Sequence, residues 1–320
     1  MVPLPHRRES GLASLVARRA LEAITTAWAA VTLTFIALRI AGGDPISSLL
    51  SQGLASPDQA AAIRQKLGLD LPLFMQYLRY LRGFFNGDLG YSLFTGRPVA
   101  RTIAEQMPST VALALTAFLL AVAAGLALGI LSARWRTPAA LARASEVAAG
   151  LGTALPVSFT GILAILLLGL AGPVAASPLR HAPLDVLVPA LVLCASPAGA
   201  IARLVQAGII ESSRAPYILA ARARGIRPLR RLLWHALRPA LAPVISLAAL
   251  EAAFLFSGTV VTETVFSRPG LGRLLVQSIL QGDFPVAQGL VALAAILYSL
   301  SHLAAELIAL ALDPRLRKRA

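Results

Sequence analysis

The chain carries little charge, one cysteine and two lysines, and each of these shortages excludes a class of protein. Only 14% of its 320 residues are charged while 57% are hydrophobic, which leaves too little polar surface to cover a water-soluble fold. The single cysteine, Cys194, excludes an internal disulfide. Neither Lys66 nor Lys318 follows a glycine-rich stretch, so the chain has no Walker A loop for nucleotide phosphates. The composition indicates a protein of the bilayer.

Common hydrolase motifs are also missing. The four histidines are scattered, and neither a His-Glu-x-x-His pair nor a Gly-x-Ser-x-Gly elbow occurs. We therefore expect no catalytic residue, no metal site and no cofactor in this chain.

Six apolar runs are long enough, at about 20 residues each, to cross a hydrocarbon core of about 30 Å. They are Ala20–Ala41, Ser109–Leu131, Val147–Ala171, Asp185–Leu204, Ala240–Thr262 and Val286–Leu312. The first run is either a cleaved signal peptide or an uncleaved anchor, and its length favours the anchor. The sequence predicts an all-α, multi-pass membrane protein with one transmembrane domain over residues 20–312. A basic N-terminal segment (1–19) precedes this domain and a basic tail (313–320) follows it.

The net charge of +14 follows membrane topology and does not indicate a nucleic-acid partner. If both termini are inside, the cytoplasmic segments hold twice as many basic residues as the external ones. Clustered Lys and Arg in short loops stay on the cytoplasmic side. We expect six spans in a bacterial or archaeal inner membrane, with both termini in the cytoplasm and an external helical loop over about residues 42–108.

The most basic loop lies at about residues 205–239 and contains seven arginines between Arg214 and Arg238. Gly225, with a proline three residues later, predicts that a short helix over Pro216–Arg224 ends there. Ala220 and Ala221 give this helix a low-profile face. The loop is therefore expected to be a cytoplasmic contact site.

An aromatic stripe in the external loop leaves two interpretations open. Tyr77, Tyr80, Phe84 and Phe85 either rest on lipid headgroups or form a lid or docking surface at the external mouth.

Three carboxylates in or near the spans are candidates for function. Glu251 and Glu306 lie deep in predicted spans, where each either faces a channel or bonds to a neighbouring helix. Glu263 begins a turn containing Pro269 and Gly270, which is placed at the external mouth.

Short motifs follow one another in order along nearly the whole chain. They are Gly43–Pro45, Leu67–Asp70, Gln76–Leu78, Gly87–Gly90, Gly96–Val99, Ala221–Gly225, His235–Arg238, Glu263–Phe266, Pro269–Gly272 and Leu312–Arg315. Their order and spacing resemble the inner-membrane permease subunits of binding-protein-dependent ABC importers, of the dipeptide, oligopeptide and nickel type.

The resemblance implies a type I ABC importer transmembrane domain that forms half of the pathway of an ATP-driven importer. The partners it implies are a second homologous permease, two cytoplasmic ATPase subunits that hold ATP and Mg, an external substrate-binding protein and the lipid bilayer. The implied cargo is a dipeptide or oligopeptide, with nickel or a metal chelate as the alternative. A self-sufficient secondary transporter, with Glu251 and Glu306 as its ion-coupling groups, is the alternative from another class.

The resemblance also identifies Tyr217–Arg227 as a coupling helix that contacts the ATPase. The family pattern begins Glu-Ala-Ala and reaches a glycine four residues after the second alanine, and here Leu219 replaces the glutamate. The implied coupling residues are Tyr217, Ala220, Ala221, Arg222, Arg224, Gly225 and Arg227. The candidate pathway or gate residues are Glu251, Glu263, Phe266, Pro269 and Gly270. The segment Gly172–Leu184 is shorter than the resemblance leads us to expect, which weakens any choice of substrate by resemblance.

Overall fold

The computed structural model describes residues 12–41, 45–51, 53, 56–133, 135, 137–170 and 184–312. Four segments named in the sequence analysis lie wholly or mostly outside the described residues. They are the basic N-terminal segment, the first two residues of the Gly43–Pro45 motif, the Gly172–Leu184 loop and the basic tail. Within the described ranges the regular elements are helices.

The elements in chain order are α1 (Leu12–Ala41), α2 (Pro45–Ser51), α3 (Pro57–Leu67), α4 (Leu73–Phe85), α5 (Val99–Ser132), α6 (Ala139–Ala154), α7 (Val157–Leu170), α9 (Leu184–Ser213), α10 (Pro216–Ala223), α11 (Pro228–Arg230), the π-helix η2 (Arg231–Leu237), α12 (Arg238–Val265), α13 (Leu271–Gln281) and α14 (Phe284–Leu312). Five segments are long and apolar enough to cross a membrane, namely α1, α5, α9, the run from α11 into α12, and α14. The bent pair of α6 and α7 makes a sixth crossing if the two count as one span. This arrangement confirms the predicted all-α membrane fold.

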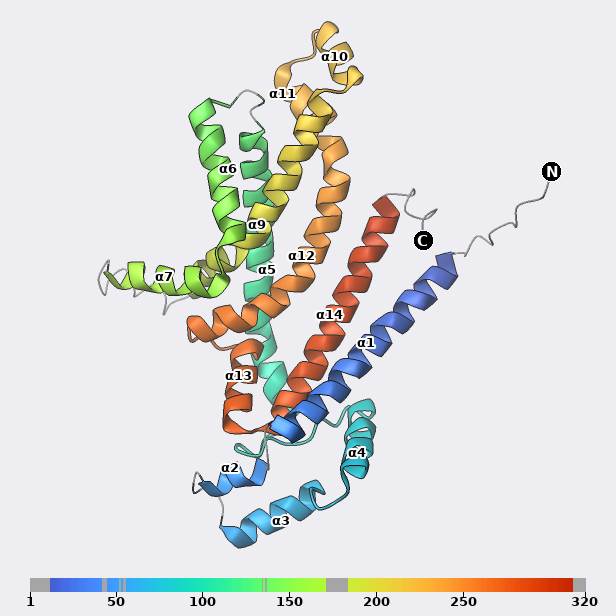
Figure 1. The fold of residues 1–320 in the computed structure, drawn as a ribbon, viewed down its shortest axis with the longest axis vertical. Helices are drawn as coiled ribbons and strands as arrows, with labels where there is room; N and C mark the ends of the chain where they lie inside the picture. Colours follow the sequence, from blue (N-terminus) through green and yellow to red (C-terminus); the bar gives the residue numbers. More distant parts are fainter. Residues whose placement is uncertain are drawn as a thin grey trace, which may run out of the picture.

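The third predicted span, Val147–Ala171, is not one continuous helix. Helix α6 ends at Ala154, α7 begins at Val157, and the two are bent by 112°, so that α7 lies across the direction of its neighbours (Figure 1). Leu155 is extended, with φ −88° and ψ 128°, because a following proline excludes the α-conformation. That proline, Pro156, was visible in the sequence.

The end of the predicted external helical loop is continuous with the second span. Helix α5 begins at Val99, so the residues from there to Pro108 form its first turns. Pro108 lies inside α5, where the helix continues at the cost of one backbone hydrogen bond.

The α5–α9 pair forms the most extensive helix contact of the fold. A Cβ atom built on Gly125 would lie 2.6 Å from Ile201 Cγ2, and one on Gly129 would lie 2.6 Å from Val205 Cβ. No side chain fits at these distances, so the two glycines allow the backbones of α5 and α9 to approach closely.

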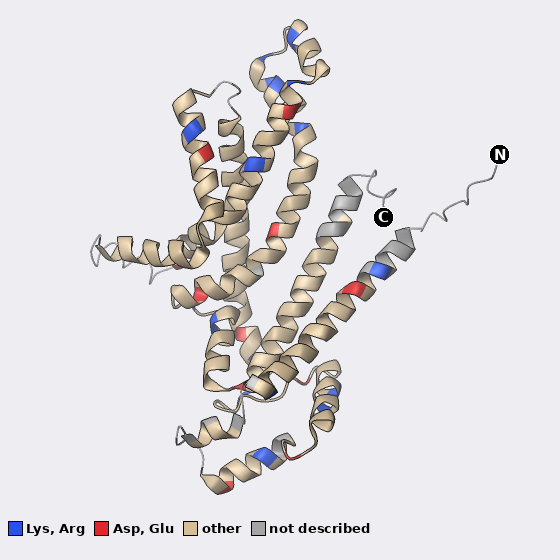
Figure 2. Cartoon of the chain, viewed as in Figure 1, with Lys and Arg blue, Asp and Glu red and all other residues tan. Residues whose placement is uncertain are grey.

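The two ends of the molecule carry different elements. Helices α10 and α11 lie at one end, while α2, α3, α4 and α13 lie at the other (Figure 1). Basic residues gather around α10 and the neighbouring ends of α6, α9 and α12, and a second group lies on α3 and α4 (Figure 2). By the positive-inside rule we assign the α10 end to the cytoplasm, because the loops there are short and basic.

Candidate functional site

Helix α10 packs against the π-helix η2, which in turn packs against α9 and α12, and two side chains of α10 are buried. Ile218 and Ala221 are each 5% exposed. Ile218 belongs to a hydrophobic cluster with Ile209 of α9, Leu232 of η2 and Val244 of α12. Any force on α10 therefore acts on the packed ends of these helices.

The C-terminus of α10 is closed by a Schellman motif. Gly225 has a φ of +71°, and its N–H donates to the Arg222 carbonyl at 3.0 Å. The Ile226 N–H donates to the Ala221 carbonyl at 3.1 Å. This pair of hydrogen bonds satisfies carbonyls that the helix end would otherwise leave unpaired. The prediction that the helix stops at Gly225 is confirmed.

The exposed face of α10 differs from the predicted one. Ala220 is exposed, but Ala221 is buried, so the expectation that both alanines form one exposed face is wrong. The physical reason is that Ala221 lies three residues after Ile218, and i, i+3 residues share a helix face. Leu219, which stands in place of the family glutamate, is 62% exposed and Tyr217 is 46% exposed.

The basic residues proposed for coupling point outward. Arg222, Arg224 and Arg227 are all exposed. Leu229 and Trp234, which the sequence analysis did not select, are 67% and 63% exposed beside them. The cytoplasmic end therefore presents a mixed surface of cations and large apolar side chains.

At the other end, Glu263 is fully enclosed within the fold. Its side chain has an exposed fraction of 0%. Thr110 of α5 donates to Oε1 at 2.6 Å, and the Gly272 and Arg273 N–H groups donate to Oε2 at 2.8 and 3.2 Å. The carboxylate thus binds the N-terminus of α13, where the backbone N–H groups and the helix dipole favour negative charge.

The turn between α12 and α13 is shaped around this carboxylate. A Cβ atom on Gly270 would lie 2.2 Å from Glu263 Cδ, so only glycine fits there. Arg268 is 8% exposed and donates from Nη1 to the Ser109 carbonyl at 2.8 Å, while the Ser109 hydroxyl donates to the Pro269 carbonyl at 2.5 Å. The turn between α12 and α13 is therefore hydrogen-bonded to α5 and is not a free loop at the external end.

The remaining pathway candidates are scattered. Phe266 is half-buried next to α7, within 3.6 Å of a Cβ placed on Gly161, and Pro269 is exposed. Glu251 is half-buried on α12, and the side chain of Glu306 lies outside what the structure describes. The described residues contain no group of three His, Cys, Asp or Glu side chains that could hold a metal ion.

A second buried carboxylate, Asp283, was missed by the sequence analysis. It is 4% exposed and accepts hydrogen bonds from Ser92 Oγ at 2.5 Å and Leu93 N–H at 3.1 Å. The backbone N–H groups of Phe94 and Val286 also donate to it. Burial raises the pKa of the Asp283 carboxyl, and these hydrogen bonds offset part of the rise. Asp283 thereby fixes the external loop to the first turn of α14.

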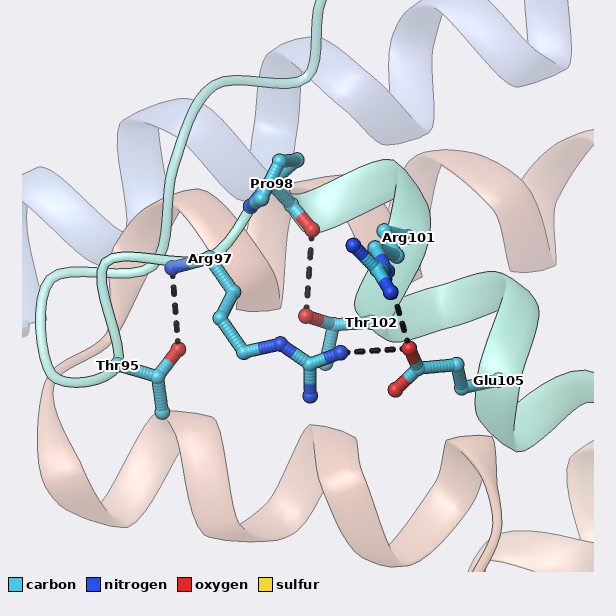
Figure 3. A network of polar contacts seen from close by, with 6 residues as sticks. All are labelled: Thr95, Arg97, Pro98, Arg101, Thr102 and Glu105. Atoms are coloured by element: carbon cyan, nitrogen blue, oxygen red, sulfur yellow. Dashed lines mark hydrogen bonds and ion pairs between the residues drawn. The ribbon is translucent and has the colours of Figure 1, made fainter.

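The loop that Asp283 holds leads directly into the start of α5, where a smaller polar network is exposed. Arg97 and Arg101 both bond to Glu105 Oε1, at 2.5 and 3.2 Å, and Thr102 Oγ1 donates to the Pro98 carbonyl at 3.2 Å (Figure 3). Exposed ion pairs of this kind contribute little to stability. The buried carboxylates are the stronger ties at this end.

The predicted aromatic stripe on α4 is divided between two faces. Tyr77 packs on Phe35 of α1 with ring centroids 5.4 Å apart, and its hydroxyl lies 2.7 Å from Thr32 Oγ1. Tyr80 stacks on the same Phe35 ring at 5.8 Å. Burial raises the pKa of Tyr80 to about 12. Phe85, by contrast, is 78% exposed, so the four aromatic residues do not form one lipid-facing or docking surface.

Comparisons with known proteins show the family to which this chain belongs. The family described as "Binding-protein-dependent transport system inner membrane component" matches residues 125–318, and the N-terminal part of such components matches residues 12–114. The chain belongs to this family. It is therefore an inner-membrane, multi-pass permease subunit of a binding-protein-dependent ABC importer, a transport protein that works with an ATPase and a substrate-binding protein.

Two relatives match this permease subunit nearly end to end. A protein of Brucella abortus (strain 2308), provisionally named as a peptide transport system permease, is 33% identical over 314 residues, which cover 96% of this chain and 99% of the relative. The glutathione transport system permease protein GsiC of Escherichia coli (strain K12) is 34% identical over 308 residues, 94% of this chain and 98% of the relative. These names do not favour the nickel alternative, and the family does not support a self-sufficient secondary transporter.

Proposed function

We propose that this permease subunit imports short peptides. The observation that carries the proposal is the match, over nearly the full length of both chains, to permeases named for peptides and for glutathione, itself a tripeptide-like thiol. The shared length includes the external loop, both ends of the pathway and the cytoplasmic coupling region.

We further propose that the subunit pairs with a second, similar permease to enclose the pathway. Two ATPase subunits bind on the cytoplasmic side and hold the ATP and Mg, and an external binding protein delivers the peptide. The exposed face of α10 is the surface that we assign to the ATPase. Tyr217 and Leu219 supply apolar contact, and Arg222 supplies charge. Because Ile218 places the opposite face of α10 in one hydrophobic cluster with residues of η2, α9 and α12, closure of the ATPase pair would move these helices together as a rigid body.

Uptake by the reconstituted complex tests this function. The chain is co-purified with its partner permease, ATPases and binding protein, and is placed in vesicles loaded with ATP. Labelled dipeptides, a tripeptide and glutathione are then compared with nickel and a nickel chelate. We expect ATP-dependent accumulation of one or more peptides and none of nickel. Accumulation of nickel without peptide would overturn the assignment of substrate, while uptake without added ATPase subunits would overturn the importer mechanism.

A matched pair of variants tests the role of α10. Leu219→Asp places a charge on the exposed face without touching the buried one, and should reduce peptide-stimulated ATP hydrolysis. Leu73→Asp changes an exposed leucine of α4 at the opposite end of the molecule from α10, and should leave binding of the ATPase intact. Equal loss of ATPase binding in the two variants would argue against α10 as the contact.

A further inference from the structure

The segment from α11 through η2 into the first turns of α12 has one buried face and one exposed face. The residues of the buried face are apolar and recur every four positions, namely Leu232, Ala236, Ala240 and Val244. Arg230, Trp234 and Arg238 have the same spacing, lie two positions out of step with the buried set, and are all exposed. Residues four apart share a helix face. These three residues, the arginine–tryptophan face, therefore lie together on the side of the segment that is turned away from the core.

The membrane-crossing segment that carries this face is longer than a hydrocarbon core. It runs over Pro228–Leu255, which is 28 residues, or about 42 Å at the helical rise per residue, against about 30 Å for the core. Its basic residues lie in its first part, and no charged residue separates Arg238 from Glu251, so the surplus length belongs at the cytoplasmic end. The arginine–tryptophan face is thereby placed at the level of the lipid headgroups, where tryptophan is enriched and long basic side chains reach the interface.

The positive charge of this face is not balanced by the chain itself. No acidic residue occurs between Glu211 and Glu251. No ion pair within the described residues involves Arg230 or Arg238. A guanidinium group binds phosphate oxygens through paired hydrogen bonds. The face therefore matches an anion that comes from outside the chain and carries phosphate.

Large apolar side chains beside the cations favour a lipid over a soluble anion. Leu233 and Trp234 are 43% and 63% exposed, and Ile245, deeper in the span, is 39% exposed. A phospholipid with its phosphate at the arginines would have acyl chains along Trp234 and Ile245. A protein partner, by contrast, would have to bring a carboxylate to each guanidinium that it covered, because burying an unpaired charge is costly. An anionic leaflet supplies phosphates at this level without that requirement.

We propose that the arginine–tryptophan face binds anionic phospholipid of the cytoplasmic leaflet, of the phosphatidylglycerol class, with headgroup phosphates at Arg230 and Arg238. The site lies on η2 and its flanking turns, so it is separate from the exposed face of α10 and does not depend on the role proposed for α10. Because η2 is the element on which α10 packs, the bound lipid also holds the base of the cytoplasmic loop at the membrane surface.

Lipid binding by the full-length chain, co-purified with its partner subunits, tests the proposal. The delipidated complex is titrated with phosphatidylglycerol or phosphatidylcholine in mixed micelles, and native mass spectrometry counts bound lipid and bound subunits. Arg230→Gln and Arg238→Gln should each weaken phosphatidylglycerol binding about fivefold, which corresponds to about 1 kcal/mol per arginine, and leave phosphatidylcholine binding unchanged. Arg224→Gln is the matched control, because it removes the same charge from an exposed arginine outside the membrane-crossing segment.

Salt dependence and a soluble competitor add two further readouts. Added salt should reduce the wild-type preference for phosphatidylglycerol, because exposed charges are screened, and should have little effect on the variant that lacks both Arg230 and Arg238. Equal weakening in the Arg224→Gln control would overturn the proposal in favour of a diffuse attraction by the whole basic loop. Displacement of the lipid by an equal concentration of glycerol 3-phosphate would overturn it in favour of a soluble anion. Unchanged lipid binding, with loss of the ATPase or the partner permease from the variant complexes, would assign the face to a protein contact instead.

Discussion

Replacement of Gly225 should separate ATP hydrolysis from transport, and the structure allows the size of the effect to be worked out. Gly225 has a φ of +71°, and a Cβ atom built on it meets nothing within 4 Å. The cost of Gly225→Val is therefore a backbone cost without a steric clash, roughly 1–2 kcal/mol for an L-residue in the left-handed region. A free energy of this size shifts the population of the capped conformation by about five- to thirtyfold.

The consequence of this shift is local to the coupling helix. Uncapping frees the Ala221 carbonyl from the Ile226 N–H, so that the last turn of α10 and its exposed arginines lose their fixed position. The close α5–α9 contact at Gly125 is far from the change, so membrane insertion and pairing with other subunits should be retained. Gly225→Asn is the control, because asparagine tolerates the left-handed region better than other non-glycine residues.

The assay compares peptide uptake with peptide-stimulated ATP hydrolysis in vesicles that contain equal amounts of assembled complex. Gly225→Val should lose most uptake while the complex still assembles, and Gly225→Asn should stay close to wild type. Wild-type levels of uptake and of peptide-stimulated ATP hydrolysis in the valine variant would refute the reasoning. They would show that the ATPase does not depend on the conformation of the C-terminal end of α10.

Three further predictions concern topology, energy coupling and the external turn. A reporter fused after Arg227 should remain cytoplasmic and one fused after Ala60 should be exported, because the basic loops stay inside; export at Arg227 would invert the topology. Glu251→Gln should leave ATP-driven uptake near the wild-type rate, since ATP supplies the energy; loss of uptake in this variant, together with inhibition by a protonophore at saturating ATP, would instead indicate ion coupling. Glu263→Ala should destabilise the protein by roughly 2–5 kcal/mol in thermal unfolding, because it leaves buried donors unpaired. Glu105→Ala, in an exposed network, should change the unfolding midpoint little. Equal shifts of the midpoint in the two variants would contradict the buried role of Glu263.

The parts of the fold that depend on local chemistry were predictable from the sequence. Gly225 ends a helix because glycine adopts a positive φ without strain, and Gly125 and Gly129 mark a close helix contact because they lie one turn apart. The break at Pro156 was equally local and was overlooked, since the apolar run continues through it. Hydrophobic length alone does not distinguish a straight span from a bent pair.

The buried carboxylates were not predictable in the same way. Glu263 bonds to Thr110, which is 153 positions away in the chain, and Asp283 bonds to Ser92, which is 191 positions away. No local pattern connects such partners, and a carboxylate near the end of a span has the same sequence signature whether it faces a pathway or caps a helix. The difference is decided by tertiary packing, which places the N-terminus of α13 against Glu263.

These contacts suggest how movement at the cytoplasmic end reaches the external end. Helix α10 packs on η2, which packs on α9 and α12, and Ile218 lies in one hydrophobic cluster with residues of all three. Helix α12 then runs without interruption from Arg238 to Val265. At its external end Glu263 binds α13 and, through Thr110, α5. If α10 is the ATPase contact, as we propose, its displacement acts on a unit that is bonded at both ends. The α12–α13 turn would then move with that unit, so that opening at the external mouth would follow from rotation of whole helices and would not require a separately hinged loop.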